Sequence, residues 1–180
     1  MDKKLLSLLI AACLGLSVST ANAALYTFTE TGFTDGATIT GSFEGTDLNL
    51  DGFISGASFT NLDEISSFNV SFSGNALVSA FSQTYTDLTY FGFDIARSVL
   101  GNADGEGIAT NWFGGARYQF LTGYAVNGAV DGYVIDTLLN VTDHTSNIVS
   151  VTPAAVPVPS AVWLFGSALA GFLSLKRRQA

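Results

Sequence analysis

Apolar and polar residues alternate along much of the middle of this chain. Between residues 65 and 73, Phe68, Val70 and Phe72 fall on one side of an extended backbone, and serine and asparagine fall on the other. Successive side chains of a β-strand point to opposite faces, so this period of two predicts a strand with one buried and one solvated face. The same alternation predicts further strands at residues 25–31, 37–43, 77–85, 89–95, 116–126, 132–138 and 147–152.

Turn-forming pairs separate these predicted strands. Asp-Gly and Asn-Gly pairs occupy residues 35–36, 51–52, 127–128 and 131–132, and Ser-Gly-Asn occupies residues 73–75. Such pairs favour the tight turns that join neighbouring strands. No segment of the body carries a sustained apolar stripe at helical spacing. Eight short strands with turns between them predict an all-β fold, a single β-sandwich or jelly-roll-like domain over residues 24–152.

The first 23 residues have a different pattern from this body. Lys3 and Lys4 precede an apolar stretch that ends in Ala21-Asn22-Ala23. A basic start, a short apolar middle and a small-x-small end predict a signal peptide cleaved after Ala23. The alternative is lipidation of Cys13, because Ile10-Ala11-Ala12-Cys13 resembles a lipobox. Cleavage after Ala23 removes the only cysteine, which excludes disulfides and thiol catalysis in the exported chain.

The charge of the body is strongly negative. Residues 24–155 contain 14 acidic residues against Arg97 and Arg117, a formal charge of −12. Such a surface repels a phosphate backbone, so we expect no nucleic-acid binding. The charge is typical of a soluble, hydrated domain and is compatible with binding of divalent cations.

The C-terminal segment has the sequence pattern of a membrane anchor. Three prolines fall within residues 153–159 and predict an extended linker after the β domain. Residues 160–175 contain no charge, and as a helix they would span about 24 Å, close to the roughly 30 Å apolar core of a bilayer. A basic cluster then stays cytoplasmic by the positive-inside rule and consists of Lys176, Arg177 and Arg178. We therefore expect a transmembrane helix at residues 160–175, with the body outside and residues 176–180 inside.

This order of proline motif, apolar span and basic end resembles the PEP-CTERM sorting tail, and more closely its VPLPA-CTERM variant. The motif residues are Val156, Pro157, Val158, Pro159, Ser160 and Ala161. Val158 stands where the PEP form has glutamate, and Ser160 stands where the VPLPA form has alanine. The resemblance covers residues 156–180 and implies a substrate of an exosortase, an integral-membrane enzyme of biofilm-forming Gram-negative bacteria. It implies cleavage near the proline motif and transfer of the body outward.

One loop of the body resembles a calcium site. Asp47, Asn49 and Asp51 place oxygen-bearing side chains at alternate positions before Gly52, as in the first half of an EF-hand loop. The position of the usual bidentate glutamate holds serine, which leaves Asp63 or Glu64 to replace it. The alternative is a tight acidic turn between strands. A second acidic, glycine-rich loop at residues 102–107 has two interpretations, a cation site and a mobile surface loop.

Catalytic patterns are weak in this chain. The single histidine, His144, lies beside Asp143, but there is no G-x-S-x-G motif to supply a nucleophile. Asp63 and Glu64 are adjacent, and adjacent strand residues point to opposite faces, so they could not flank one glycosidic bond. We therefore expect no enzymatic activity.

The aromatic residues have two candidate uses. They fill the core between the sheets, or some of them line a groove for glycans; the candidates for the groove are Tyr85, Tyr90, Trp112, Tyr118, Tyr124 and Tyr133. Taken together, these features predict an exported protein that reaches the cell surface or extracellular matrix, with a structural or adhesive role in an exopolysaccharide matrix. The alternatives are a carbohydrate- or calcium-dependent binding module and a secreted hydrolase.

Overall fold

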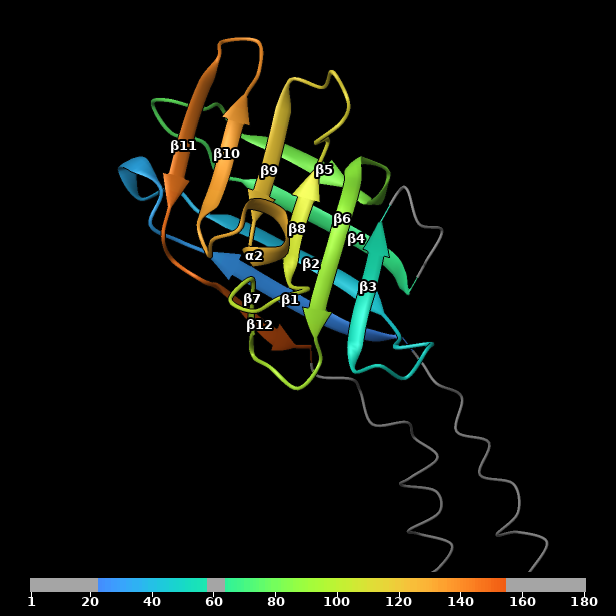
Figure 1. The fold of residues 1–180 in the computed structure, drawn as a ribbon. Helices are drawn as coiled ribbons and strands as arrows, with labels where there is room; N and C mark the ends of the chain where they lie inside the picture. Colours follow the sequence, from blue (N-terminus) through green and yellow to red (C-terminus); the bar gives the residue numbers. More distant parts are fainter. Residues whose placement is uncertain (1–22, 58–63, 155–180) are drawn as a thin grey trace, which may run out of the picture.

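The computed structural model describes residues 23–57 and 64–154. The leader with Ala21 and Cys13, the sorting motif, the apolar span and the basic cluster lie outside these ranges, as does Asp63. Within them the chain is mostly β and forms two antiparallel sheets of six strands each (Figure 1). The all-β prediction is confirmed at this level.

The first sheet has the strand order β5-β4-β2-β1-β12-β7. Its members are β1 (Ala24–Glu30), β2 (Ile39–Gly45), β4 (Ile65–Phe72), β5 (Phe81–Thr84), β7 (Val99–Leu100) and β12 (Val149–Pro153). The first and last strands of the body, β1 and β12, pair antiparallel inside this sheet, with Tyr26 opposite Pro153. The two ends of the body are therefore neighbours.

The second sheet has the order β11-β10-β9-β8-β6-β3. Its members are β3 (Phe53–Ala57), β6 (Leu88–Asp94), β8 (Gly107–Thr110), β9 (Tyr118–Thr122), β10 (Gly132–Asp136) and β11 (Val141–Thr145). The helical segments are η1 (Thr34–Gly36), η2 (Tyr85–Asp87) and α2 (Tyr124–Asn127). In the part of the chain that is described, no helix has the length and hydropathy needed to cross a bilayer.

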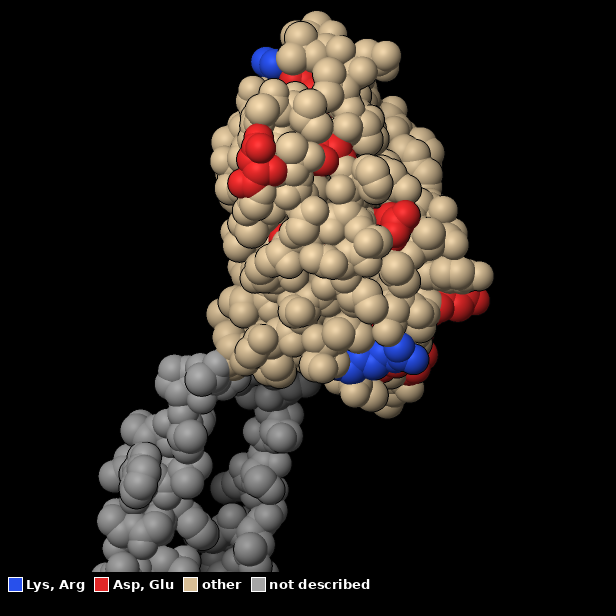
Figure 2. Space-filling view, turned by 90° about the vertical axis from the view of Figure 1, so that its left-hand side faces the viewer, with Lys and Arg blue, Asp and Glu red and all other residues tan. Residues whose placement is uncertain are grey.

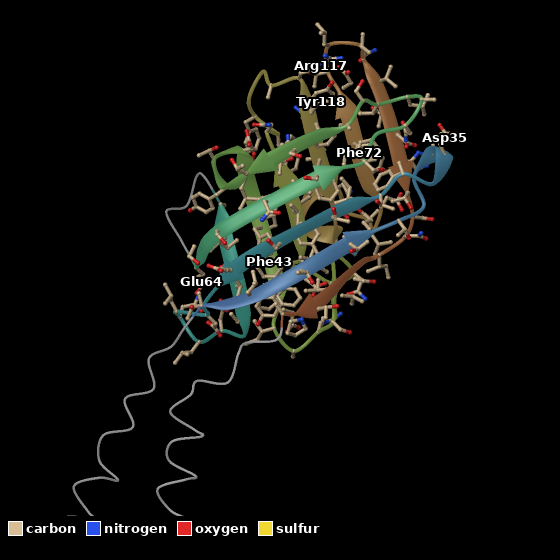
Figure 3. All side chains as sticks on the ribbon, turned by 180° about the vertical axis from the view of Figure 1, so that it is seen from behind. Asp35, Phe43, Glu64, Phe72, Arg117 and Tyr118 are labelled. Atoms are coloured by element: carbon tan, nitrogen blue, oxygen red, sulfur yellow. The ribbon has the colours of Figure 1, made fainter. Side chains whose placement is uncertain are left out.

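Aromatic side chains from the two sheets form the core between them (Figure 3). Phe43 of β2 meets Phe91 of β6 with ring centroids 4.6 Å apart, and it meets Phe93 at 5.4 Å. Phe68 of β4 also contacts Phe91, at 6.1 Å. Aromatic pairs at such separations contribute beyond the area they bury. The phenylalanines thus serve mainly to fill the core, which was the first of the two uses that the sequence suggested for the aromatic residues.

Each of the eight predicted strands overlaps a strand of the structure, but two of the predicted ranges are too long. The segment 77–85 is a strand only from Phe81, because the Asn75 side chain accepts hydrogen bonds from the amides of Leu77 and Val78 and holds a turn there. The segment 116–126 ends at Thr122, and α2 follows.

Four strands were missed because they lack the alternating pattern. All four residues of β8 are buried, so the strand shows no polar face. The inner face of β11 carries Asp143 and Thr145, which bind neighbouring loops instead of packing as apolar residues. β7 has only two residues, and β3 is interrupted by serine and glycine.

Candidate functional site

Both ends of the described body leave it at the same place. Ala24, the first residue of β1, is opposite Gly45, and the amide of Ala154 donates a hydrogen bond to the carbonyl of Leu25 at 2.8 Å. Figure 1 shows this end at the bottom, and we call it the tether end. The predicted leader and the predicted tail therefore join the body side by side.

The predicted calcium loop connects β2 to β3 at the tether end. Asp47 accepts hydrogen bonds from the amides of Asp51 at 3.1 Å and Gly52 at 2.9 Å. The side-chain oxygen of Asn49 also accepts from the Asp51 amide, and Asp51 accepts from the amide of Phe53. The three predicted ligands thus gather in one turn, and their oxygens already accept backbone amides.

Glu64, the residue directly before β4, also binds this loop. Its carboxylate is buried and accepts the amides of Leu48 and Asn49 through Oε1 and both the amide and the hydroxyl of Ser55 through Oε2. Four donors satisfy this carboxylate and fasten the loop to β3. Among residues 23–57 and 64–154 there is no group of three or more His, Cys, Asp or Glu side chains that could hold a metal ion. The hydrogen bonds of Asp47, Asn49, Asp51 and Glu64 are those of a turn fastened to its neighbours, and calcium binding stays a prediction.

The second acidic loop is organised around a buried carboxylate. Glu106 accepts the amides of Gly101, Asn102 and Ala103 through Oε2, each at 3.1 Å. Its Oε1 lies 3.8 Å from Nε of Arg97, which also pairs with Asp94 at 3.2 Å. This carboxylate therefore shapes the loop, and an arginine already faces its second oxygen.

His144 and Asp143 point to opposite faces of β11. Asp143 is buried and accepts the amide and hydroxyl of Thr34 and the side-chain amide of Asn75, so it fastens two loops to the sheet. His144 is exposed and stacks on Tyr133 with ring centroids 6.0 Å apart. The pair has a structural role and no catalytic geometry.

The aromatic residues predicted for a glycan groove are spread over the molecule. Tyr118 stacks on Phe81 at 5.0 Å as part of the core, and the hydroxyl of Tyr90 donates to the carbonyl of Gly105. Tyr124 lies on α2 and Tyr133 on β10. These four tyrosines thus lie on four different elements, β9, β6, α2 and β10.

An exposed apolar surface lies at the end of the body opposite the tether end. Trp112 and Phe113 occupy the loop between β8 and β9, and their rings stack 5.4 Å apart and nearly parallel. Phe113 is 74% exposed, and Leu138 in the β10–β11 turn is 71% exposed, with Leu139 exposed beside it. Figure 1 shows both loops at the top of the molecule. We call these four residues the distal apolar end; sequence reasoning missed all but Trp112, because distant segments form it.

An ion pair supports this distal end. Two nitrogens of Arg117 donate to Asp136, the shorter contact being 2.9 Å, and the guanidinium lies 4.8 Å from the ring centre of Tyr118 (Figure 3). Asp136 also accepts the amides of Leu138 and Leu139 and so fixes the leucine turn. The hydrogen bond from Arg117, and to a lesser extent these amides, hold the pKa of Asp136 below its ordinary value.

The two arginines are the only basic residues of the described chain, and each is paired with a carboxylate. Figure 2 shows acidic side chains scattered over one face, where the basic side chains in view lie beside acidic ones. Comparison with known proteins finds no family model, no curated protein and no solved structure that matches this chain.

Proposed function

We propose that this chain is an exported bacterial protein of the cell surface or extracellular matrix, sorted by its C-terminal tail. In this proposal residues 1–23 direct export, and residues 160–175 hold the body at the inner membrane. An exosortase then cleaves near residues 156–159 and releases the body outward. The body itself is assigned to the β-sandwiches, with a jelly-roll-like form, on the basis of its two sheets and their common aromatic core.

The observation that carries this proposal is the common exit of both chain ends. Ala23 is exposed and β1 begins at the next residue, so cleavage there would leave the fold intact. Ala154 leaves beside β1, so a tail attached there holds the body by one end. A body tethered in this way presents its distal apolar end to its surroundings, which supports an adhesive or structural role in an exopolysaccharide matrix.

The sorting step is tested by the C-terminus of the mature protein. In a host with an exosortase, mass spectrometry is expected to find a chain that ends near residues 156–159. Replacing Pro157 and Pro159 with alanine is expected to keep the tail attached and the protein in the membrane fraction. Pro153→Ala is the matched control, because Pro153 belongs to β12 and precedes the motif. A mature wild-type protein that extends to Ala180 would contradict the proposal.

A carbohydrate- or calcium-dependent binding module is the alternative that a specific observation favours. Trp112 and Phe113 offer the stacked, exposed rings on which sugars pack, and the loop at Asp47 gathers oxygen ligands. A glycan array probed with and without chelator distinguishes this function from a purely structural one. Loss of a glycan signal in Phe113→Ser would assign binding to the distal apolar end.

For the calcium part of this alternative we expect a negative result. The oxygens of Asp47 and Asn49 already accept backbone amides, so the loop holds its shape without an ion. The melting temperature is therefore expected to be the same in chelator and in millimolar calcium. A calcium-dependent rise that disappears in Asp47→Asn would instead favour the calcium-dependent module.

A further inference from the structure

The loop that joins β2 to β3 turns its leucines toward solvent. Leu48 is 68% exposed and Leu50 is 86% exposed, whereas the polar side chains between them fold back onto the loop backbone. Hydrophilic residues usually occupy such a turn, because their side chains gain nothing from leaving water. Here two large apolar side chains are exposed in the turn, beside the exposed polar residues Asn49 and Asp51.

The backbone at Leu50 adds to this observation. Its φ is +62°, a left-handed conformation that few residues other than glycine and asparagine adopt. The amide of the next residue, Asp51, is held by the side chains of Asp47 and Asn49, and these bonds maintain the turn. The loop therefore holds a leucine outward where glycine would fit the backbone better, and such strain is concentrated at functional positions.

These leucines lie at the tether end together with a third apolar side chain. The loop starts directly after Gly45, which is opposite Ala24, the first residue of β1. The amide of Ile95 donates to the carbonyl of Gly52 at 3.1 Å, and Ile95 is 43% exposed. Leu48, Leu50 and Ile95 therefore belong to segments at the tether end, near the place where the chain leaves the body; we call these three residues the tether leucine surface.

The length of the chain beyond the body limits how far this end can lie from a membrane. Six residue steps separate Ala154 from Ser160, where the predicted span begins. At no more than about 3.6 Å per residue, they reach roughly 20 Å. A body held by this linker stays near the bilayer, and the surface around the exit is the part closest to it.

We propose that the tether leucine surface rests in the interfacial region of the membrane that holds the tail. This inference rests on the proposed function, because it needs the tail to span that membrane. The three apolar side chains gain free energy when they leave water at the interface. Asp47, Asp51 and Asp94 lie at the same end, and Arg97 pairs only with the last of them, so the charge around the surface is negative. Anionic headgroups would be repelled, and the lipid face that fits is zwitterionic.

The contact has a consequence for processing. It orients the body so that the distal apolar end points away from the lipid. It also keeps the proline motif at the membrane surface, where an integral-membrane protease acts. Strong capture of the body by lipid is not needed, because the tail already supplies the attachment.

The test measures the depth of single labelled positions in the chain of residues 24–180, which lacks the leader and still carries its tail. This chain contains no cysteine, so Leu50→Cys, Leu138→Cys and Phe165→Cys each carry one fluorophore. The proteins are reconstituted into phosphatidylcholine nanodiscs that contain nitroxide-labelled lipids. Headgroup nitroxides are expected to quench the label at residue 50 several-fold more than the label at residue 138, which is also a strongly exposed apolar site but lies at the distal end. Acyl-chain nitroxides are expected to quench the label at residue 165.

The outcomes separate this inference from the proposed function. Quenching at residue 165 with equal, weak quenching at residues 50 and 138 would overturn the membrane contact and leave the anchor intact. Absence of quenching at residue 165 would overturn both. In an unlabelled double variant, Leu50→Cys with Phe165→Cys, a disulfide between the two positions, together with no lipid quenching of the single label at residue 50, would assign the leucines to the tail and also overturn the contact.

A second variant controls for the label itself. Replacing Leu48 with serine and Leu50 with asparagine is expected to lower headgroup quenching of a label at Ile95→Cys several-fold, while the melting temperature falls little, because both side chains are exposed. Unchanged quenching in this variant would count against the proposal.

Discussion

Replacing Glu30 with glutamine is expected to stabilise the protein by an amount that grows as the pH rises. Glu30 is fully buried between the sheets, with its Oε1 accepting the hydroxyl of Thr122 at 3.1 Å and its Oε2 without a hydrogen-bond partner. The pKa of Glu30 is raised from 4.5 to about 8, chiefly because the carboxyl is buried; the hydrogen bond from Thr122 opposes this rise, and the negative charge of Asp131 adds to it. The folded protein therefore carries this carboxyl in its protonated form at neutral pH.

The direction of the effect follows from proton linkage. Below pH 4.5 both the folded and the unfolded chain hold the proton of Glu30, and this group's contribution to the free energy of unfolding is at its full value. As the pH rises toward about 8, only the unfolded chain releases the proton, so stability is lost at roughly 1.4 kcal/mol per pH unit. Glutamine keeps the neutral hydrogen bond and has no proton to lose.

The measurement is urea unfolding of wild type and Glu30→Gln between about pH 5 and pH 8. The gap between their free energies of unfolding is expected to widen by several kcal/mol over this window. Thr29→Asn, on the solvent face of the same strand, is the control and should follow wild type at every pH. Parallel curves for wild type and Glu30→Gln would show that burial does not hold the proton. The window avoids lower pH, where Asp136 acts in the opposite sense: its pKa is lowered, so its contribution is lost as the pH falls.

The second large effect is expected at Gly123, between β9 and α2. A Cβ placed there would lie 2.7 Å from the Cα of Gly107 and 2.8 Å from the Cα of Gly101, and these backbone atoms cannot move aside cheaply. The φ of Gly123 is +94°, which adds conformational strain for any other residue. We expect Gly123→Ala to lower the free energy of unfolding by on the order of 3 kcal/mol.

Gly128 provides the matched control for this substitution. It ends α2 with a φ of +73°, and nothing lies within 4 Å of a Cβ built on it. Gly128→Ala therefore carries conformational strain without a clash, and about 1 kcal/mol is expected. Urea unfolding of both variants at one pH compares them. Equal losses would mean that the close approach of the three glycine-bearing segments has no energetic role.

The two ends of the body divide the proposed tasks between them. The tether end carries both chain exits and exposed leucines, and the distal end carries stacked aromatic rings above the pair of Arg117 and Asp136. In a body attached to the membrane at one end, a rigid core between the two sheets is enough to keep these two ends apart. The phenylalanine contacts between the sheets supply that rigidity.

The candidate site could be predicted only where it is local. Asp47, Asn49 and Asp51 lie within five residues, so the sequence was enough to bring them together in one turn. The four hydrogen bonds that the carboxylate of Glu64 accepts were not predictable, because their donors come from two different segments, the loop itself and β3. The distal apolar end was missed for the same reason, since Phe113 and Leu138 meet at one end only when β9 pairs with β10.

Local alternation decided which residues of β4 face the core, because the period of two is a property of the extended backbone alone. Composition and order along the chain likewise decided the expectations for the leader and the tail. Sheet membership depended on contacts between distant segments: β8 has no polar face because it is covered on both sides, and β11 turns Asp143 inward because two loops bind it. Burial of a charged group such as Glu30 also depends on what packs against it, so only the tertiary structure could place its proton.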